Sequence, residues 1–498
     1  MNLARILEAH PDDAVALISR NRRTTYGELR SQIARMRGGL VGLGIEPGDR
    51  VGIICANNWY FVLSYLGILG AGAVAVPLNP LSPARELERE LAAVGTRAVI
   101  LGPAGRQAFA AVERSRVPTL EAVVVSGADD IVGSTPLDAV LAGEPAPVVE
   151  REDGDLAVLI FTSGTAGSPK AAMLSHGNLR SNIEQVLAST GFEHRPDDVS
   201  LGVLPMFHIY GLNAVLGVAL ARGGTILLIE RFDPQSAAEA IGRQGVTIIA
   251  GAPTMWAAWA SMPDLPPGTF ATVRMAASGA ARLAPEVAAR VHERFGLDLA
   301  EGYGLTEASP VVTSSAGISP HKVGSIGVPL PGVEVRLVDA DGEDVLIGDE
   351  GEIWVRGPNV FGGYWNDRRA TAAALTPDGW LRTGDIAVVD DDGYVFLVDR
   401  AKDLIIVSGF NVYPAEVEEV LVDHPGIEQA AVVGVSHPYS GEAVKAYVVA
   451  APGASIEEDD VIAFAAQHLA RYKCPEKVMF VDEIPHGLAG KVLRRALR

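Results

Sequence analysis

A repeated alternation of strand-like and helix-like segments through roughly the first three hundred residues most constrains the fold. Short apolar runs such as VGIICA, TILLI, VTIIAG and VRMAAS are each followed, after a turn, by a helical run. The helices expected after these runs span residues 59–69, 234–243, 255–261 and 285–295. Such alternation is typical of a parallel or mixed sheet covered by helices, so the pattern predicts α/β architecture with ligand sites at the strand ends.

The pattern changes between residues 324 and 398, where GVEVRLVDADGEDV, GEIWVRG and GYVFLVDR predict short strands separated by Asp-Gly turns. After residue 399 comes a compact tail with a helix over residues 415–422 and strands around AAVVGV and AVKAYVVA. A second tail helix is expected to open at Ser455, because Glu458 three residues later completes a capping-box pattern. We therefore predict a large N-terminal domain of α/β sheets with a β-rich subdomain, residues 1–400, and a small mobile α+β C-terminal domain, residues 401–498.

Composition excludes several classes of protein. The net charge of −20 comes without any block of lysine or arginine, which argues against nucleic acid or an anionic membrane as the main partner. The two cysteines, Cys55 and Cys474, form neither a close pair nor a zinc-binding cluster, and acidic residues interrupt the N-terminal segment too early for a signal peptide. The uncharged stretch between Arg50 and Arg85 is broken by glycines and Pro77, which predicts a buried helix and a core strand and no membrane span. A cytoplasmic protein is expected.

The segment FTSGTAGSPK, residues 161–170, follows an apolar run typical of a buried strand. Its glycines allow close approach of backbone N–H groups to an anion, its hydroxyls add donors, and Lys170 adds a positive charge. The P-loop of kinases does not match, because Gly164 and Gly167 are too close together and Pro169 separates Lys170 from its glycine. Taken alone, the segment predicts either a phosphate-binding loop or a solvated turn.

Further segments follow in order: LPMFHIYGL, ASGAARL, EGYGLTE, WLRTGDI, DRAKDLIIVSGFNVYPAEVE and GLAGKVLRRALR. Together with residues 161–179, they resemble, over nearly the whole chain, the motifs of the adenylate-forming (ANL) superfamily. That family includes acyl-CoA synthetases, hydroxycinnamate-CoA ligases, beetle luciferases and peptide-synthetase adenylation domains. The resemblance implies that ATP and Mg²⁺ convert a carboxylate into an acyl-AMP with release of pyrophosphate, and that the thiol of CoA then displaces AMP.

The same resemblance implies which residues hold the nucleotide. They are Thr162, Ser163, Gly164, Thr165, Gly167 and Lys170 for the phosphates, Ser278, Gly279, Ala280, Gly302, Tyr303 and Gly304 for the rest of ATP or AMP, and Asp385 and Arg400 for the ribose. Thr306 is implied to contact the α-phosphate, and Glu307 to bind Mg²⁺, for which a carboxylate oxygen is a suitable ligand. The chain departs from the family at Ala166, which removes a hydroxyl from the loop, and at Arg282 in the adenine segment.

Several residues are implied to act in the reaction itself. Lys491 bridges the carboxylate and the α-phosphate during adenylation, and His208 lies between the acyl and nucleotide sites. Lys402 is the hinge of the C-terminal domain, and Gly409 adjoins the tunnel for the CoA thiol. Without the resemblance, His208 would be interpreted as a core histidine and Lys491 as a surface lysine near a chain end.

The segments around the expected acyl site are apolar. The pocket residues are Phe207, Tyr210, Met255, Trp256 and Val311. PMFHIYGL contains no aspartate to hold an ammonium group, which disfavours amino acids. GAPTMW and LTEASPVV are most similar to bacterial fatty acyl-CoA synthetases, so we expect a medium- or long-chain fatty acid–CoA ligase. An acyl-AMP ligase that loads a carrier protein, an aryl-CoA ligase, a luciferase-like oxygenase, a non-catalytic acyl-adenylate binder and a homodimer stay open as alternatives.

Overall fold

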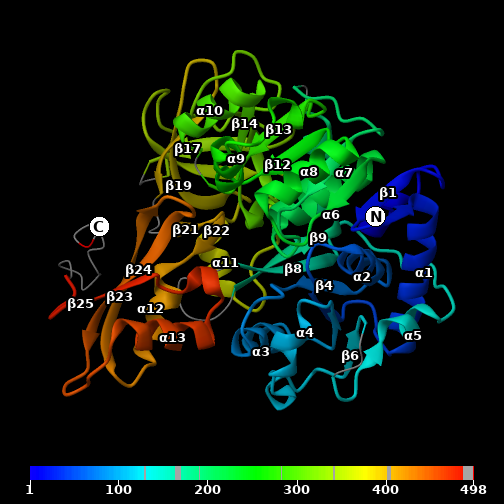
Figure 1. The fold of residues 1–498 in the computed structure, drawn as a ribbon, viewed down its shortest axis with the longest axis horizontal. Coiled ribbons are helices and arrows are strands. Elements are labelled where there is room, and N and C mark those ends of the chain that lie inside the picture. The colour runs from blue at the N-terminus through cyan, green and yellow to red at the C-terminus, as the bar shows by residue number, and fades with distance from the viewer. Residues whose placement is uncertain are drawn as a thin grey trace.

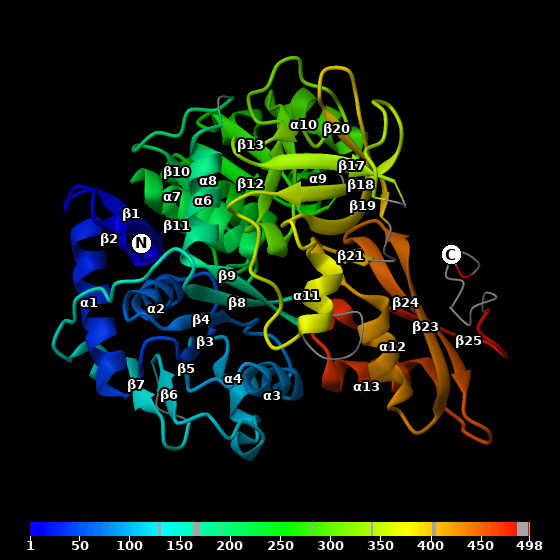
Figure 2. The same ribbon diagram turned by 180° about the vertical axis from the view of Figure 1, so that it is seen from behind.

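The computed structural model describes residues 1–498 except 128–130, 163–169, 190, 282, 340–341, 401–404, 486–496 and 498. The side chains of residues 267, 398–400, 411 and 415 are also left undescribed. Figures 1 and 2 show a large N-terminal part, blue to yellow, and a smaller C-terminal part, orange to red, beside it. The predicted α/β fold class, with a large and a small domain, is confirmed.

The first sheet of the N-terminal part has the strand order β7-β6-β5-β3-β4-β8-β9. Its strands are β3 (Arg50–Ile54), β4 (Val74–Pro77), β5 (Ala98–Leu101), β6 (Ala122–Val125), β7 (Thr135–Pro136), β8 (Leu156–Thr162) and β9 (Lys170–Ser175). All neighbours pair in parallel except β8 and β9, which form an antiparallel hairpin. The helices between these strands are α2 (Trp59–Gly70), α3 (Ala84–Ala93), α4 (Arg106–Ala110) and α5 (Leu137–Leu141). The β8–β9 turn is therefore where the predicted phosphate loop falls.

The second sheet has the order β16-β15-β14-β13-β12-β10-β11-β1-β2. Its strands are β1 (Val15–Ser19), β2 (Arg22–Thr25), β10 (Val199–Gly202), β11 (Thr225–Leu228), β12 (Ile248–Gly251), β13 (Met275–Ser278), β14 (Leu299–Gly304), β15 (Val311–Ser314) and β16 (Val328–Pro329). Its helices are α1 (Tyr26–Gly42), α6 (His176–Leu187), α7 (Val218–Arg222), α8 (Pro234–Gln244), α9 (Pro253–Ser261) and α10 (Pro285–Phe295), with a π-helix over Tyr210–Gly217. The strands from β10 to β14 pair in parallel, so their carboxyl ends share one edge.

The predicted β-rich subdomain is a four-stranded antiparallel sheet in the order β17-β18-β19-β20. It consists of β17 (Glu334–Val338), β18 (Gly351–Arg356), β19 (Leu381–Val389) and β20 (Val395–Arg400), with α11 (Arg368–Ala374) between β18 and β19. The middle of β19 lies beside β14 of the second sheet, because Asp385 and Tyr303 of these two strands share a hydrogen bond.

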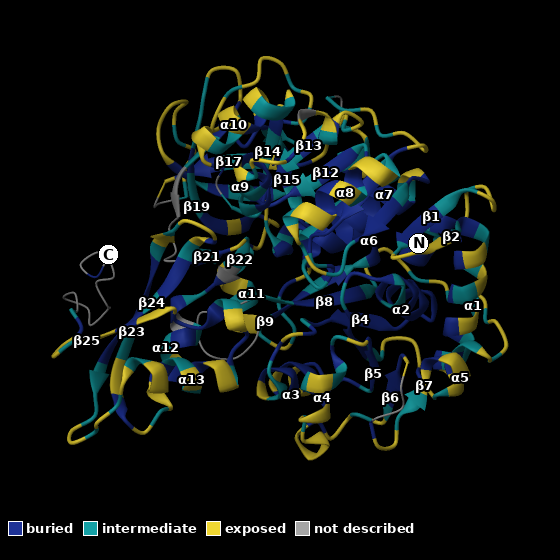
Figure 3. Ribbon diagram, in the orientation of Figure 1, coloured by how far each residue is buried: buried dark blue, intermediate teal, exposed yellow. Residues whose placement is uncertain are grey.

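The C-terminal part has its own sheet, in the order β22-β21-β24-β23 with β25 beside β24. Its elements are β21 (Ile405–Val407), β22 (Phe410–Val412), α12 (Pro414–Val422), β23 (Ile427–His437), β24 (Gly441–Ala450), α13 (Glu458–His468) and β25 (Lys477–Phe480). A separate apolar core joins the sheet to α12 and α13. Figure 3 shows the buried strands of the N-terminal sheets in dark blue and the outer faces of α8 and α10 in yellow.

One helix begins later than the sequence predicts. α13 opens at Glu458, capped by Glu457, whose backbone N–H donates to Asp460 at 3.0 Å, so the predicted start at Ser455 is wrong. With Glu457 as the cap, Ile456 lies just before the helix and joins Val461, the fourth helical residue, in the same apolar cluster, the pairing typical of a hydrophobic staple. Among the described residues, no helix is long and apolar enough to cross a lipid bilayer.

Candidate active site

The floor of the candidate site lies at the carboxyl ends of three neighbouring parallel strands. Gly251 of β12 is in register with Ser278 of β13, which is in register with Glu301 of β14. Ser278 is only 3% exposed, and among the described residues its hydroxyl has no hydrogen-bond partner. A buried, unpartnered hydroxyl is costly in the absence of a ligand, so this edge presents a donor to an incoming molecule.

The acyl-side residues contact this floor directly. A Cβ on Gly279 would lie 2.9 Å from both Cε1 and the hydroxyl of Tyr210, so the absence of a side chain at residue 279 lets the tyrosine ring pack there. Tyr210 begins the π-helix, a widened turn that is frequent at functional sites. Met255 and Trp256 come from the first turns of α9, and the Trp256 indole N–H already donates to the Ala277 carbonyl at 3.1 Å. The predicted acyl and adenine segments therefore meet.

Asp385 and Tyr303 are brought together from different sheets. Tyr303 lies on β14, and its hydroxyl donates a 2.7 Å hydrogen bond to Oδ2 of Asp385 on β19. Arg400 on β20 is the cross-strand partner of Asp385 in backbone register, although its side chain lies outside the described residues. The tyrosine fixes one oxygen of the carboxylate.

Lys170 and Glu307 are linked by a residue that the sequence analysis missed, Tyr364. Its hydroxyl donates to Oε1 of Glu307 at 2.5 Å, and the Lys170 ammonium lies 5.5 Å from the centre of its ring. Burial raises the pKa of Tyr364, and the charge of Glu307 raises it further, so the hydroxyl remains a donor. The run FGGYW, glycines around an aromatic residue after a strand, was the only sequence signal for it.

The oxygen ligands available here fit Mg²⁺ only together with a nucleotide. Glu307 stands in a short 3₁₀ turn, Thr306–Ala308, and its carbonyl accepts from Phe361 N–H at 2.8 Å. In the part of the chain that the structure describes, no group of three or more His, Cys, Asp or Glu residues could hold a metal ion. Mg²⁺ is commonly bound by one or two carboxylates together with substrate phosphates, and a lone Glu307 beside Lys170 suits that arrangement.

His208 is neutral in the folded protein at pH 7. It is half-buried between the buried side chains of Met206 and Ile209, and loss of hydration lowers its pKa to about 4. Its Nδ1 accepts from Tyr210 N–H at 3.4 Å, a contact at the limit of hydrogen-bond distance. An uncharged imidazole suits the border between an apolar acyl group and a nucleotide.

A loop of the C-terminal domain reaches the same floor. Gly409, in the turn between β21 and β22, has φ +86°, and a Cβ built on it would lie 3.5 Å from Ala280 Cβ and 3.6 Å from Ala252 Cβ. The next residue, Phe410, stacks on Phe207 with ring centres 6.2 Å apart and planes 8° from parallel. The turn therefore packs between the adenine and acyl segments.

Some predicted residues lie outside the described part of the chain. They are Ser163, Gly164, Thr165 and Gly167 of the phosphate loop, the hinge Lys402 and Lys491. Thr162 and Lys170, which flank the loop, are cross-strand partners in the β8–β9 hairpin. The remaining predicted residues fall on the elements described above: Gly302 and Gly304 on β14, Val311 at the start of β15, and Thr306, which is buried, in the 3₁₀ turn.

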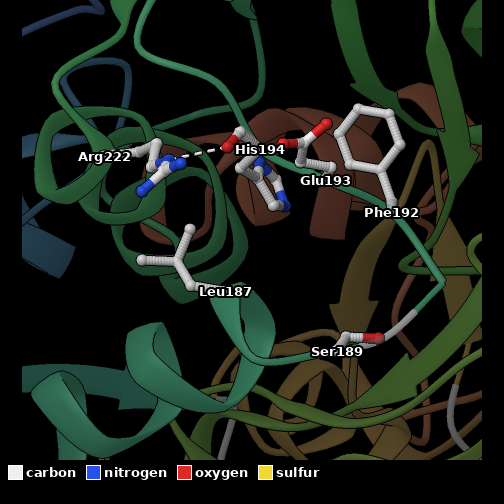
Figure 4. Close-up of a pocket in the computed structure, with 6 residues that line it drawn as sticks. All are labelled: Leu187, Ser189, Phe192, Glu193, His194 and Arg222. Atoms are coloured by element: carbon white, nitrogen blue, oxygen red, sulfur yellow. Dashed lines mark hydrogen bonds between the residues drawn. The ribbon is translucent and has the colours of Figure 1, made fainter.

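A separate surface hollow of about 300 Å³ lies at the ends of α6 and α7 (Figure 4). It is lined by Leu187, Ser189, Phe192, Glu193, His194 and Arg222. Arg222 Nε donates to the His194 carbonyl at 2.6 Å, the dashed line in Figure 4. None of the predicted site residues lines it.

Comparison with known families agrees with this geometry. The model of the AMP-binding enzyme family matches residues 3–365, and the model of the AMP-binding enzyme C-terminal domain matches residues 416–491. The first covers both N-terminal sheets with Lys170, Ser278 and Glu307, and the second covers most of the C-terminal sheet.

Curated relatives extend over nearly the full chain. A feruloyl-CoA synthase of Amycolatopsis sp is 40% identical over 95% of this chain and 93% of its own length. A long-chain-fatty-acid–CoA ligase of Yersinia pestis is 38% identical over 92% of this chain and 86% of its own length. Among solved structures, the amide bond synthetase McbA from Marinactinospora thermotolerans superposes with a TM-score of 0.90, at 33% identity over 100% of this chain and 99% of its own. The chain therefore belongs to the AMP-binding enzyme family, within the adenylate-forming superfamily predicted from its motifs, and its relatives place it among the acyl- and aryl-CoA ligases.

Proposed function

We propose that this protein is an AMP-forming acid–thiol ligase that activates a medium- or long-chain fatty acid. Two contacts carry the proposal: Tyr210 of the acyl segment packs on Gly279, and the Gly409 turn of the C-terminal domain lies against Ala280 of the adenine segment and Ala252. They bring the acyl segment, the adenine segment and a loop of the C-terminal domain together. An enzyme that transfers an acyl group from AMP to a thiol needs these three parts in contact.

In the first step, a carboxylate oxygen of the acid attacks the α-phosphorus of ATP, and the bond to pyrophosphate breaks. Glu307 would hold Mg²⁺ together with the phosphates, and the ion would supply charge neutralisation there. The Lys170 ammonium lies over the ring of Tyr364, and Glu307 accepts from the hydroxyl of the same tyrosine. This arrangement fits a cation and a metal ligand placed along one phosphate chain. Asp385, whose carboxylate is oriented by Tyr303, would accept from the ribose hydroxyls.

In the second step, the CoA sulfur attacks the acyl carbonyl carbon, the thiol proton is lost, and AMP leaves with the bonding electrons. Gly409 suits the approach of the thiol, because it has no side chain at the point where the C-terminal turn meets Ala252 and Ala280. His208 is uncharged at neutral pH, so it does not hold a second anion beside the acyl-AMP.

The fatty acid assignment rests on the apolar character of the acyl side. The segment over residues 204–212 carries no acidic or basic side chain other than His208, and the N–H of Trp256 is already paired. A charged substrate tail would be buried there without a partner. Relatives named as long-chain-fatty-acid–CoA ligases, such as that of Yersinia pestis, support this choice.

A hydroxycinnamate-type aryl acid is the second candidate. The relative named feruloyl-CoA synthase is 40% identical over 95% of the chain, and the aromatic rings of Phe207 and Tyr210 would pack on a planar substrate.

The test is a panel of saturated fatty acids of increasing length beside ferulic, benzoic and amino acids, with ATP, Mg²⁺ and CoA. Pyrophosphate and acyl-CoA are both measured. We expect turnover that rises with chain length and no turnover of amino acids. A preference for ferulic acid would replace the fatty acid assignment by the second candidate. Pyrophosphate release without thioester would instead indicate a carrier protein or an amine as the acceptor, and no pyrophosphate with any acid would contradict the proposed function.

A further inference from the structure

A buried ion cluster joins the two domains away from the nucleotide site. The ammonium of Lys473 donates to Oε1 of Glu86 at 2.7 Å and to Oε1 of Glu416 at 3.0 Å. Glu86 stands in the first turn of α3 in the N-terminal domain, whereas Glu416 stands in the first turn of α12 in the C-terminal domain. Lys473 itself lies in a short 3₁₀ turn between α13 and β25. The lysine therefore connects its own domain to the opposite one.

The cluster is closed to solvent. The side chains of Lys473 and Glu86 are 8% and 5% exposed, and that of Glu416 is 15% exposed. Burial by itself disfavours the charged lysine, but Tyr472, Glu86 and Glu416 outweigh this and raise the pKa of Lys473 well above its usual value. Removing one partner of such a pair leaves a buried charge uncompensated, which is far more disruptive than the loss of a surface ion pair.

The residue before Lys473 continues the contact toward the acyl site. Tyr472 stacks on Phe410 with ring centres 4.5 Å apart, and Phe410 stacks in turn on Phe207 of the acyl segment. Gly409, next to Phe410, is the residue that packs against Ala252 and Ala280. One ring contact thus connects Tyr472, beside Lys473, to the turn that holds Gly409, and a second connects that turn to the acyl segment.

Helix α3 supplies further contacts to the same domain. Arg89 donates to the His468 carbonyl at the last residue of α13 at 3.2 Å, and Arg85 lies 3.4 Å from His468 Nε2. A cation at the carboxyl end of a helix is electrostatically favourable. These contacts are exposed, so the buried pair of Glu86 and Lys473 is the stronger part of this surface.

This domain orientation presents the Gly409 turn to the site, against Ala252 and Ala280. The orientation thus suits the thioester step.

We infer that Lys473 is a positioning residue for thioester formation, holding the C-terminal domain against Glu86 of α3 so that the Gly409 turn stays at the acyl-adenylate. The inference rests on the proposed two-step function. Adenylation, which requires another domain orientation, does not depend on this contact.

The test compares Glu86→Gln with Glu88→Gln in full-length protein. Glu88 lies on the same helix and is equally buried, but it accepts from Glu113 N–H at 2.8 Å and faces Arg116, both within the N-terminal domain. Pyrophosphate release reports adenylation, and mixing isolated acyl-AMP with CoA reports the second step. We expect Glu86→Gln to slow the second step about tenfold, as loss of a charged hydrogen bond does, and to leave adenylation unchanged. Glu88→Gln should change neither.

A distance measurement tests the contact without activity. Spin labels at Leu81→Cys and Tyr439→Cys, positions 76% and 83% exposed on opposite domains, should give one dominant distance that Glu86→Gln broadens and Glu88→Gln does not. Both native cysteines are buried and should remain unlabelled. Lys473→Gln should disturb the distance distribution more than Glu86→Gln, because it leaves both Glu86 and Glu416 without their shared partner. Equal slowing of both steps by Glu86→Gln, or an unchanged distance distribution, would overturn the inference.

If the unaltered protein releases no pyrophosphate, the proposed function fails, and the distances still decide whether Glu86 holds the domains together.

Discussion

The hydroxyl of Tyr364 donates a 2.5 Å hydrogen bond to Oε1 of Glu307, while the ring of the same tyrosine faces the Lys170 ammonium. These two contacts bring together three segments that are far apart in the sequence. They are β9, which follows the predicted phosphate loop, the turn after β14, and the segment before α11. One tyrosine contacts both the Lys170 ammonium and the carboxylate proposed to bind Mg²⁺.

Tyr364→Phe should raise the Mg²⁺ concentration needed for half-maximal pyrophosphate release about tenfold. The reason is that residues that orient a metal ligand contribute on that order to metal affinity. The ring, and with it the contact to Lys170, is retained. A Mg²⁺ titration measures the effect. Tyr394→Phe is the matched control, since its hydroxyl donates to the Pro320 carbonyl at 2.8 Å away from the site. An unchanged titration for Tyr364→Phe would show that Glu307 needs no orientation by this residue.

Asp385→Ala should raise the KM for ATP, because the charged hydrogen bonds lost are worth about 1.5 to 3 kcal/mol. Tyr303→Phe removes only the support of one carboxylate oxygen and should have a smaller effect in the same direction. Initial rates at varied ATP give both values. If ATP binds equally well to Asp385→Ala, the aspartate of β19 does not hold the ribose.

Lys491→Ala should abolish adenylation yet leave thioester formation from supplied acyl-AMP largely intact. The reason is that adenylation places a cation between carboxylate and α-phosphate, whereas the second step needs that space for the thiol. Separate assays of the two half-reactions measure this. Equal loss in both assays contradicts the role proposed for Lys491.

Lys402→Pro should have the converse effect, retaining adenylation and losing most thioester formation. Residue 402 lies between β20, which ends at Arg400, and β21, which begins at Ile405, so the two domains are joined there. Proline fixes φ near roughly −65° and should hold one domain orientation. The same paired assays apply, and a variant unimpaired in both steps rules the hinge out.

Because His176 is buried in its neutral form, we expect the protein to be less stable at pH 5 than at pH 7.5. Its side chain is fully buried at the start of α6, where Nδ1 accepts from Leu3 N–H at 3.1 Å, and burial lowers its pKa from 6.5 to about 4. Between these values the unfolded chain binds a proton that the folded chain does not, so the free energy of unfolding falls as pH falls, by up to about 1.4 kcal/mol per pH unit. Urea unfolding at pH 7.5 and 5 should show a smaller difference for His176→Asn, which keeps an acceptor. Exposed His321→Asn is the control, and an equal pH effect in all three proteins contradicts the assignment.

Boundary residues in the sequence predicted the ends of helices and strands well where the packing of the core favoured the same ends. The helix over residues 285–295 has the predicted bounds, because Pro285 at its first position and Gly296 after its end are unambiguous boundaries. The start of α13 was wrong because Ser455 and Glu457 both begin plausible capping boxes. Packing of Ile456 with Val461, which depends on the tertiary core, decides between them.

Candidate site residues with a motif of their own could be proposed from the sequence, and those defined by contact between distant segments could not. Lys170, Glu307 and Asp385 stand in short motifs with a clear chemical reason. Tyr364 acts only because β9 and the turn after β14 come to lie beside it, and Lys473 only because α3 of the other domain supplies Glu86. Neither pairing leaves a pattern within one stretch of sequence.

The contact between Tyr210 and Gly279 has a consequence for altering substrate preference. Because a Cβ at residue 279 would come within 2.9 Å of the tyrosine ring, the sizes of these two side chains form one shared volume and not two independent ones. A library at residue 279 alone would mostly produce overpacked proteins, and one at residue 210 alone would mostly leave a void. Substitutions chosen as pairs, with a smaller residue at 210 whenever 279 gains a side chain, would explore pocket shape at constant packing density.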